Sequence, residues 1–299
     1  MDKILAWLES RTDIKSLRAA VCDLNGVMRG KRIPLEQAEK VLSGGLRMPL
    51  SVVGVDIWGE DIVKSPLVFA TGDADGTCES TGRGILPVDW TAEPSGLIPL
   101  WLREESGVPF GGDPRRALAA LVDRFKAHGL TPMMAMELEF YLYDPTNARP
   151  IAPVSPVTRK RLDADGVLSI DELDDFGSFF EEVYAACAAQ GVPADSAIAE
   201  NGIGQFEINL MHVDDPLRAA DDAVLFKRIV RGLARKHGFA ASFMAKPYGE
   251  RSGSGLHVHF SLLDSKGKNV FDDGSNDGSI TMRHAVGGLI ESMPETTLL

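Results

Sequence analysis

Strict alternation of polar and apolar positions is the clearest pattern in the second half of the chain. In the segments near residues 133–143, 203–211 and 256–263, every second side chain is apolar. A period of two is typical of a β-strand, because successive side chains point to opposite faces. We therefore expect strands in these three segments and a further strand at about 240–245.

Apolar positions at helical spacing separate these strands. They predict helices at about 172–190, 215–237 and 280–293. The first ten residues form a further short amphipathic pattern. Another helix is expected after Asp113, which is a good N-cap followed by proline, and Gly129 is a natural stop for it.

The first hundred residues carry a different pattern, with short apolar runs bounded by turn residues. Residues 17–24 and 50–57 are the strand candidates there. The organisation changes near residue 110, where the first long helix begins. We therefore expect a small β-rich domain at 1–109 and a second domain, which alternates strands and helices, at 110–299.

The expected last helix has an apolar pattern typical of a buried element. The chain then ends on Thr297, Leu298 and Leu299 without a polar tail. From this we expect that sequence that normally follows Leu299 is absent.

The polar faces of the three alternating strands carry an unusual set of side chains. They offer carboxylates, imidazoles and amides, and Glu200 lies just upstream of the second strand. The residues on these faces are Glu137 and Glu139; Gln205, Glu207 and Asn209; and His257, His259 and Ser261. Taken singly, such a face usually just meets water. Taken together, four carboxylates would repel one another unless cations lay between them.

A carboxylate and imidazole set of this kind suits Mg²⁺ or Mn²⁺. Two such ions could bridge the oxygens of a phosphoryl group in transfer. The residues alone leave two readings open, a solvated sheet face and a two-metal site.

Composition narrows the class of protein. Hydrophobic residues make up 44% of the 299, and the formal net charge is -12, which argues against a general nucleic-acid binder. The sequence has no apolar run near the ~20 residues of a membrane span and no signal-peptide core at its start. We expect a cytoplasmic protein that does not bind membranes.

A glycine-rich segment, residues 249–255, leads into the histidine strand. Its glycines would let backbone approach a ligand closely, although a plain hairpin turn explains the spacing equally well. The sequence has no P-loop motif, and Gly202-x-Gly204 lacks the third glycine of a dinucleotide fingerprint.

These segments resemble successive signatures of the glutamine synthetase family. The similar stretches are Met136–Phe140, Glu200–Asn209 and Lys246–Leu262, in the order and at about the spacing of the family, and Asp23 to Lys31 is similar to its N-terminal domain. The resemblance implies an α+β fold, with an N-terminal β-grasp domain and a catalytic α/β domain that has a mainly antiparallel sheet. It also implies a ring-shaped homo-oligomer with active sites between subunits.

The chemistry that the resemblance implies is ligation in nitrogen metabolism. ATP phosphorylates the γ-carboxylate of glutamate, and ammonia or another amine then displaces phosphate, with Mg²⁺ or Mn²⁺ as cofactor. The implied roles by motif position are as follows: Glu139, Glu200 and Glu207 as ligands of one metal, Glu137 and His257 as ligands of the second, His259 and Ser261 as nucleotide contacts, Gly253 as a glutamate contact, and Asp56 as the carboxylate that receives the incoming ammonium.

Two departures from the family pattern change the expectation. Ser252 stands where glutamine-forming members carry an asparagine, which favours the branch that ligates glutamate to polyamines or other amines. The arginines of the family for phosphate and glutamate, and its last metal carboxylate, lie past Leu299. We therefore predict that this chain has no ligase turnover alone, because the developing phosphoryl charge lacks its cationic partners.

Two rival functions stay open at this point. One is a non-catalytic protein of the same fold that binds metal or nucleotide or serves in assembly. The other is a two-metal phosphohydrolase, which the acidic cluster alone would permit and which would act without glutamate.

Overall fold

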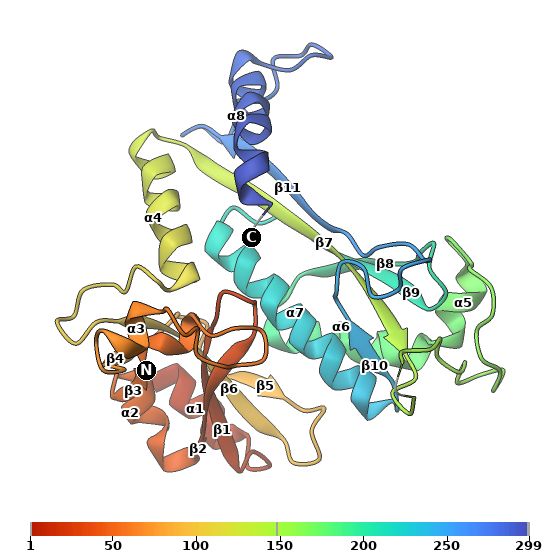
Figure 1. The fold of residues 1–299 in the computed structure, drawn as a ribbon, viewed down its shortest axis with the longest axis horizontal. Coiled ribbons are helices and arrows are strands. Elements are labelled where there is room, and N and C mark those ends of the chain that lie inside the picture. The colour runs from red at the N-terminus through yellow and green to blue at the C-terminus, as the bar shows by residue number, and fades with distance from the viewer. Residues whose placement is uncertain (1, 148, 298–299) are drawn as a thin grey trace.

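The computed structural model describes residues 2–147 and 149–297, which build two β-sheets with helices around them (Figure 1). The first sheet has the order β2-β1-β6-β4-β3, with β5 paired to β6. Its strands are β1 (Ser16–Cys22), β2 (Met28–Pro34), β3 (Leu46–Pro49), β4 (Asp75–Ser80), β5 (Leu86–Val88) and β6 (Ser95–Arg103). The pairing of β1 with β6 is parallel, and the other pairings of this sheet are antiparallel.

Short helices pack against this sheet, and together they form a hydrophobic core separate from that of the second sheet. Leu17, Val21, Ile98 and Leu102 are almost fully buried within it. The helices are α1 (Asp2–Ser10), α2 (Ala38–Leu42) and α3 (Pro66–Phe69), with 3-10 turns η1 (Leu35–Gln37) and η2 (Leu50–Val53). The expected N-terminal helix and the strand expected at 17–24 are confirmed.

The second sheet is antiparallel in all its named pairings, as predicted. Its order is β10-β7-β9-β8, and β11 pairs with the first part of β7. The strands are β7 (Thr131–Tyr143), β8 (Ala194–Ala199), β9 (Gln205–Leu210), β10 (Ala240–Ser242) and β11 (Leu256–Leu263). The long strand β7 therefore has β9 on one side and both β11 and β10 on the other.

Helices bury the apolar face of the second sheet. Phe140 and Phe206 from the sheet pack against Phe179 and Phe226 from the helices in a core with aromatic edge contacts. The helices of this part of the chain are α4 (Pro114–Ala127), α5 (Ile170–Asp175), α6 (Gly177–Gln190), α7 (Pro216–Lys236) and α8 (Ile280–Thr296), of which α8 has no buried residue and does not cover the sheet. With this face covered, the polar side chains of β7, β9 and β11 are left on the opposite face.

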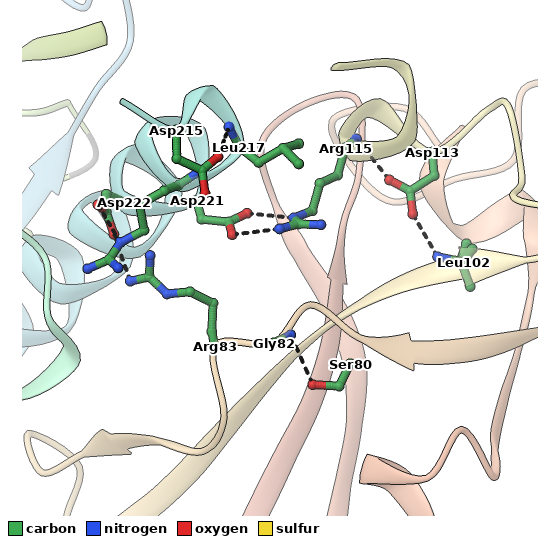
Figure 2. A network of polar contacts seen from close by, with 11 residues as sticks. Ser80, Gly82, Arg83, Leu102, Asp113, Arg115, Asp215, Leu217, Asp221 and Asp222 are labelled. Carbon is green, nitrogen blue, oxygen red and sulfur yellow. Dashed lines mark hydrogen bonds and ion pairs between the residues drawn. The ribbon is translucent and has the colours of Figure 1, made fainter. Parts of the chain in front are cut away.

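Ion pairs connect α7 to the loop between β4 and β5 and to the start of α4 (Figure 2). Arg83, in the connection between β4 and β5, lies 2.7 Å from Asp222, and both side chains are buried. Arg115 at the start of α4 forms a two-pronged pair with Asp221 at 3.0 and 3.2 Å. Since a buried ion pair is costly to break, the Arg83–Asp222 pair fixes α7 against the first sheet, and the Arg115–Asp221 pair fixes α7 against α4.

Four sequence expectations need correction. Residues 50–57 do not form a strand, because Pro49 ends the pairing with β4 and the chain turns into η2. The helix expected at 172–190 is two helices that break at Phe176, whose ring enters the core. The strand β8 was not predicted, since its small residues give a weak pattern.

The fourth correction concerns α8, whose apolar residues are exposed rather than buried. Leu289 is 52% exposed and Ile290 is 66% exposed. Helical spacing predicts an apolar face, but it does not provide an element to cover that face. In the part of the chain that the structure describes, no helix is long and apolar enough to cross a bilayer.

Candidate functional site

The polar faces of β7, β9 and β11 lie side by side, as the family resemblance led us to expect. Glu137 stands at the centre, directly opposite Asn209 of β9 and His257 of β11. Two residues along β7, Glu139 is directly opposite Glu207. Directly opposite side chains in a sheet are close enough to interact, so the backbone register alone gathers these groups.

Glu137 contacts both histidines of β11. His257 Nδ1 lies 2.9 Å from Oε2 of the carboxylate, and His259 Nε2 lies 3.0 Å from Oε1. Burial tends to raise the pKa of Glu137, but the hydrogen bonds from the two imidazoles outweigh it and the pKa is lowered. The same hydrogen bond raises the pKa of His257. The carboxylate is thus held in its anionic form.

Glu207 is the most deeply buried acid of the group. Burial and, after it, the negative charges of Glu137, Glu200 and Glu139 together raise its pKa to about 7. The pKa of Glu200 is also raised, first by burial and then by the charge of Glu139. All four carboxylates therefore share one electrostatic environment, in which each additional negative charge is unfavourable.

This environment fits a divalent cation. One ligand atom each from Glu137, Glu207 and His257 lies within 4.8 Å of the other two. Two amide oxygens on the same face, Gln205 Oε1 and Asn209 Oδ1, are buried without a hydrogen-bond partner. Oxygen-rich donors with one imidazole are the set that Mg²⁺ and Mn²⁺ accept, and a cation would relieve the repulsion.

Gly255 leaves room for this cluster. A Cβ atom at that position would lie 2.9 Å from Glu139 Oε1 and 3.0 Å from His257 Nε2, closer than real side chains come. The absence of a side chain at Gly255 therefore lets one carboxylate and one imidazole approach the same spot. This favours a ligand role for the glycine-rich segment over a plain hairpin turn.

Two side chains from the sheet hold the glycine-rich segment in place. Tyr141 donates its hydroxyl hydrogen to the carbonyl oxygen of Ser252 at 2.7 Å. Gln205 donates from Nε2 both to Glu139 Oε2 and to the carbonyl oxygen of Gly253, each at 2.8 Å. The carbonyl groups of the segment are therefore positioned against the carboxylate cluster.

The remaining predicted residues lie at or outside the edge of this cluster. Ser261 follows His259 on the same face of β11, opposite Met133. Asp56 is in the loop after η2, beside the first sheet, where Oδ1 accepts hydrogen bonds from the backbone of Trp58 and Glu60 at 2.9 and 2.8 Å. Within this chain, Asp56 is therefore tied to its own loop rather than to the carboxylate cluster.

Sequence reasoning missed three contributors. Tyr141 lies on the polar face of β7 and was passed over because an aromatic residue in a strand looks like core. The pattern assigned Gln205 to the polar face of β9, but it did not predict the hydrogen bonds by which Gln205 connects Glu139 to Gly253. His212 is the second residue after the end of β9, and its ring centre lies 6.4 Å from that of His259, a contact that depends on the path of the chain after the strand.

Comparison with known proteins decides the family. The family model described as "Glutamine synthetase, catalytic domain" matches residues 111–299. The chain belongs to the glutamine synthetase family. Residues before 111 lie outside that match, so a β-grasp domain at 1–109 and the boundary with 110–299 stay predictions.

Individual relatives agree with this assignment. The gamma-glutamylputrescine synthetase PuuA of Escherichia coli (strain K12) is 37% identical over 300 residues, 99% of this chain and 63% of that protein. A glutamate–isopropylamine ligase of Pseudomonas sp is 29% identical, over 93% of this chain and 61% of that protein. This member of the glutamine synthetase family therefore spans about three fifths of the length of these relatives.

Solved structures show the same fold. The structure described as apo GmaS without ligand is 26% identical and superposes with a TM-score of 0.80, covering 97% of this chain and 64% of that one. A GmaS/ADP complex superposes with a TM-score of 0.79. The catalytic fold predicted from the sequence is thereby confirmed, whereas the roles of individual residues stay predictions.

Proposed function

We propose that this chain carries the metal and nucleotide site of an ATP-dependent ligase that joins an amine to the γ-carboxylate of glutamate. The observation that supports it most is the convergence of Glu137, Glu207 and His257, in a member of the glutamine synthetase family. Mg²⁺ or Mn²⁺ bound there would stabilise negative charge on phosphoryl oxygens. The proposed reaction passes through γ-glutamyl phosphate.

The proposed roles follow the motif positions, with geometry in support. Glu139, Glu200 and Glu207 hold one cation, and Glu137 and His257 hold the second. The pKa of Glu207 is raised first by burial and then by the negative charges of its neighbours, and both effects would be offset by a bound cation, which supports a metal site here. His259 and Ser261 continue along β11 from the metal ligands, so a nucleotide held there would have its phosphates near the cations.

We further propose that Gly253 contacts glutamate. The hydrogen bond from Gln205 fixes its carbonyl group, and the Tyr141 hydrogen bond fixes the preceding residue. Because the segment is already held at two points, little further entropy is lost in ordering it when glutamate binds. Asp56 is proposed to receive the ammonium group in a neighbouring subunit of a ring, because it lies away from the cluster of its own chain.

An amine other than ammonia is the preferred second substrate. The relatives described above include synthetases named for putrescine and for isopropylamine, and Ser252 departs from the glutamine-forming pattern. Putrescine is a cation at neutral pH, and a net charge of -12 favours its approach. We propose a γ-glutamyl-polyamine or γ-glutamyl-amine ligase.

We propose that the 299-residue chain binds metal and ADP by itself. Turnover is proposed to require further residues, which the longer relatives have. The test is phosphate release from ATP and glutamate with putrescine, isopropylamine or ammonia, measured on the 299-residue chain and on a chain of the relatives' length that contains it. We expect metal-dependent ADP binding by both and turnover only by the longer chain, fastest with an organic amine.

Two outcomes would reject parts of this proposal. Metal and nucleotide binding without turnover by the longer chain, over the whole series of amines, would favour the non-catalytic protein of the same fold. Phosphate release that does not depend on glutamate would favour the phosphohydrolase.

A further inference from the structure

A group of basic side chains gathers where α7 meets the edge of the first sheet, on a part of the molecule distinct from the carboxylate cluster. It lines two adjoining hollows of about 200 and 150 Å³. We call this group the basic seam. It consists of Arg18 and Arg32 from β1 and β2, and of Lys227, Arg228, Arg231 and Arg235 from α7.

The β1–β2 pair and α7 both contribute basic side chains to these hollows. Arg18 and Arg32 are directly opposite each other in the β1–β2 ladder, and like charges in that relation are destabilising. On α7, Arg228, Arg231 and Arg235 recur at spacings of three and four, so they share one face of the helix. Arg228 lines both hollows and therefore joins the two sets.

Carboxylates do not balance these charges. Among the residues that the structure describes, the ion pairs within 4.0 Å include none to Arg18, to Arg228 or to the other basic residues of α7 in the seam. Arg32 is the exception, with a pair to the exposed Glu93 at 3.2 Å. Asp23, whose negative charge acts on Lys227, already receives a hydrogen bond from Arg29 at 2.8 Å.

Donors in the seam are also left without partners. Arg18 Nη1 and Arg228 Nε are buried and make no hydrogen bond within the chain. Burial and then mutual repulsion lower the pKa of Arg18, Arg228, Arg231 and Lys227, each through a neighbour in the seam or next to it. A guanidinium donor that is buried without an acceptor is costly, so an acceptor from outside the chain would be stabilised here.

The favourable interaction of basic residues with a helix C-terminus explains only part of this arrangement. It accounts for Arg235 near the end of α7. Cation–π contacts with the Phe243 ring, at 5.9 and 5.4 Å from the ring centre, stabilise the charged ends of Lys227 and Arg231. The helix C-terminus does not account for Arg18 and Arg32, which come from the first sheet and line the same hollow as Arg228 of α7.

We propose that the basic seam binds a small oxyanion with at least two negative charges, such as a phosphate compound or a dicarboxylate. Guanidinium groups from two elements would clamp its oxygens, as paired arginines do in phosphate and carboxylate sites. Because the hollow lies between the first sheet and α7, such an anion would tie the two parts of the chain together. A ligand in this position would also stabilise the folded chain by mass action.

The test is thermal unfolding and calorimetry of the 299-residue chain in EDTA without nucleotide, which removes metal-dependent binding from the measurement. The probes are inorganic pyrophosphate and succinate, each against chloride at matched ionic strength. We expect one of the two to raise the melting temperature, and the better probe identifies the phosphate or the dicarboxylate chemistry. In the double variant R18Q/R228Q, affinity should fall at least about tenfold, while R124Q on the exposed end of α4 should bind as wild type does.

Without anion, R18Q/R228Q should melt no lower than wild type, because the substitutions remove repulsion. If that variant fails to fold, R235Q at the rim must weaken binding of the anion instead. The proposal is overturned if neither probe acts beyond chloride, or if the effect survives in the seam variants. It is also overturned if the seam variants only disperse a self-associated form of the chain, since the occupant is then a second copy.

Discussion

His257 and Glu137 face each other across the β7–β11 ladder, with the imidazole Nδ1 2.9 Å from the carboxylate Oε2. The pair leaves Nε2 of His257 beside Gly255 and close to Glu139. One ring nitrogen is thus oriented by a carboxylate while the other faces the carboxylate cluster. In metal sites, a carboxylate often accepts a hydrogen bond from a ligand imidazole and so orients its ring. Here Glu137 makes that contact and is itself a proposed ligand.

Glu207→Gln should make the metal-free chain less sensitive to pH. The folded pKa of Glu207 is about 7 against an ordinary value of 4.5, so between these values the folded state binds more protons than the unfolded state. Wild type should therefore lose stability relative to the variant as the pH rises from 4.5 to 7, by roughly 1–3 kcal/mol. Chemical denaturation at several pH values in EDTA measures the difference.

Glu207→Gln should also weaken Mn²⁺ binding by more than roughly 100-fold. Loss of a residue that only hydrogen-bonds a metal ligand costs less than this. Glu181→Gln, on the exposed face of α6, is the control and should change neither property. If the free energy of unfolding varied with pH equally in wild type and in Glu207→Gln, the pKa of Glu207 would not be raised in the folded chain.

Gly255→Ala should weaken metal binding by about tenfold with little loss of stability. The added Cβ would lie 2.9 Å from Glu139 Oε1 and 3.0 Å from His257 Nε2, so both side chains must move. Since these are the ends of flexible side chains, unfolding free energy should change by less than about 1 kcal/mol. Calorimetric titration with Mn²⁺ checks the affinity, and Gly249→Ala, whose Cβ would meet no atom within 4 Å, is the matched control.

Tyr141→Phe should loosen the glycine-rich segment without unfolding the sheet. The hydroxyl is the group that ties the segment to β7 at Ser252, and its loss should cost about 0.5–1.5 kcal/mol. Hydrogen exchange of the Ser254 amide should accelerate, because its bond to the Ala245 carbonyl depends on the position of the segment. Tyr184→Phe on α6 should leave that exchange unchanged, and unaltered exchange in Tyr141→Phe would remove this role from the tyrosine.

Arg83→Met should destabilise the folded chain by weakening the contact between α7 and the connection from β4 to β5. It leaves the buried Asp222 with Arg218 as its remaining cationic partner, and removal of one member of a buried pair costs about 3 kcal/mol or more. Arg218→Met breaks the more exposed pair with the same aspartate and should cost less than about 1 kcal/mol. Denaturant unfolding compares the two, and equal losses would mean that burial of the Arg83 pair has no special weight.

Most of the carboxylate cluster could be predicted from the sequence because strand alternation decides which side chains share a face. Glu137, Glu139, Glu207 and His257 are all on the face that the pattern assigned to them. The family resemblance supplied the expectation that these strands are neighbours, which periodicity alone does not give. The buried and exposed faces then follow from the apolar residues that pack on α6 and α7.

Other features depend on contacts between segments that are distant in sequence. The role of Tyr141 rests on a hydrogen bond to a residue 111 positions later, and the basic seam rests on β1 and α7 meeting. The false strand at 50–57 has a local cause, since an apolar run looks alike in a strand and in a 3-10 turn, and Pro49 decided between them.

The most direct test of the central claim is pulsed electron paramagnetic resonance of Mn²⁺ bound to the 299-residue chain. Wild type should bind Mn²⁺ and show modulation from a directly coordinated imidazole nitrogen. That modulation should vanish in His257→Ala and persist in His284→Ala, which changes an exposed histidine of α8. Absence of Mn²⁺ binding, or nitrogen modulation that survives in His257→Ala, would contradict the claim that β7, β9 and β11 build a divalent-metal site.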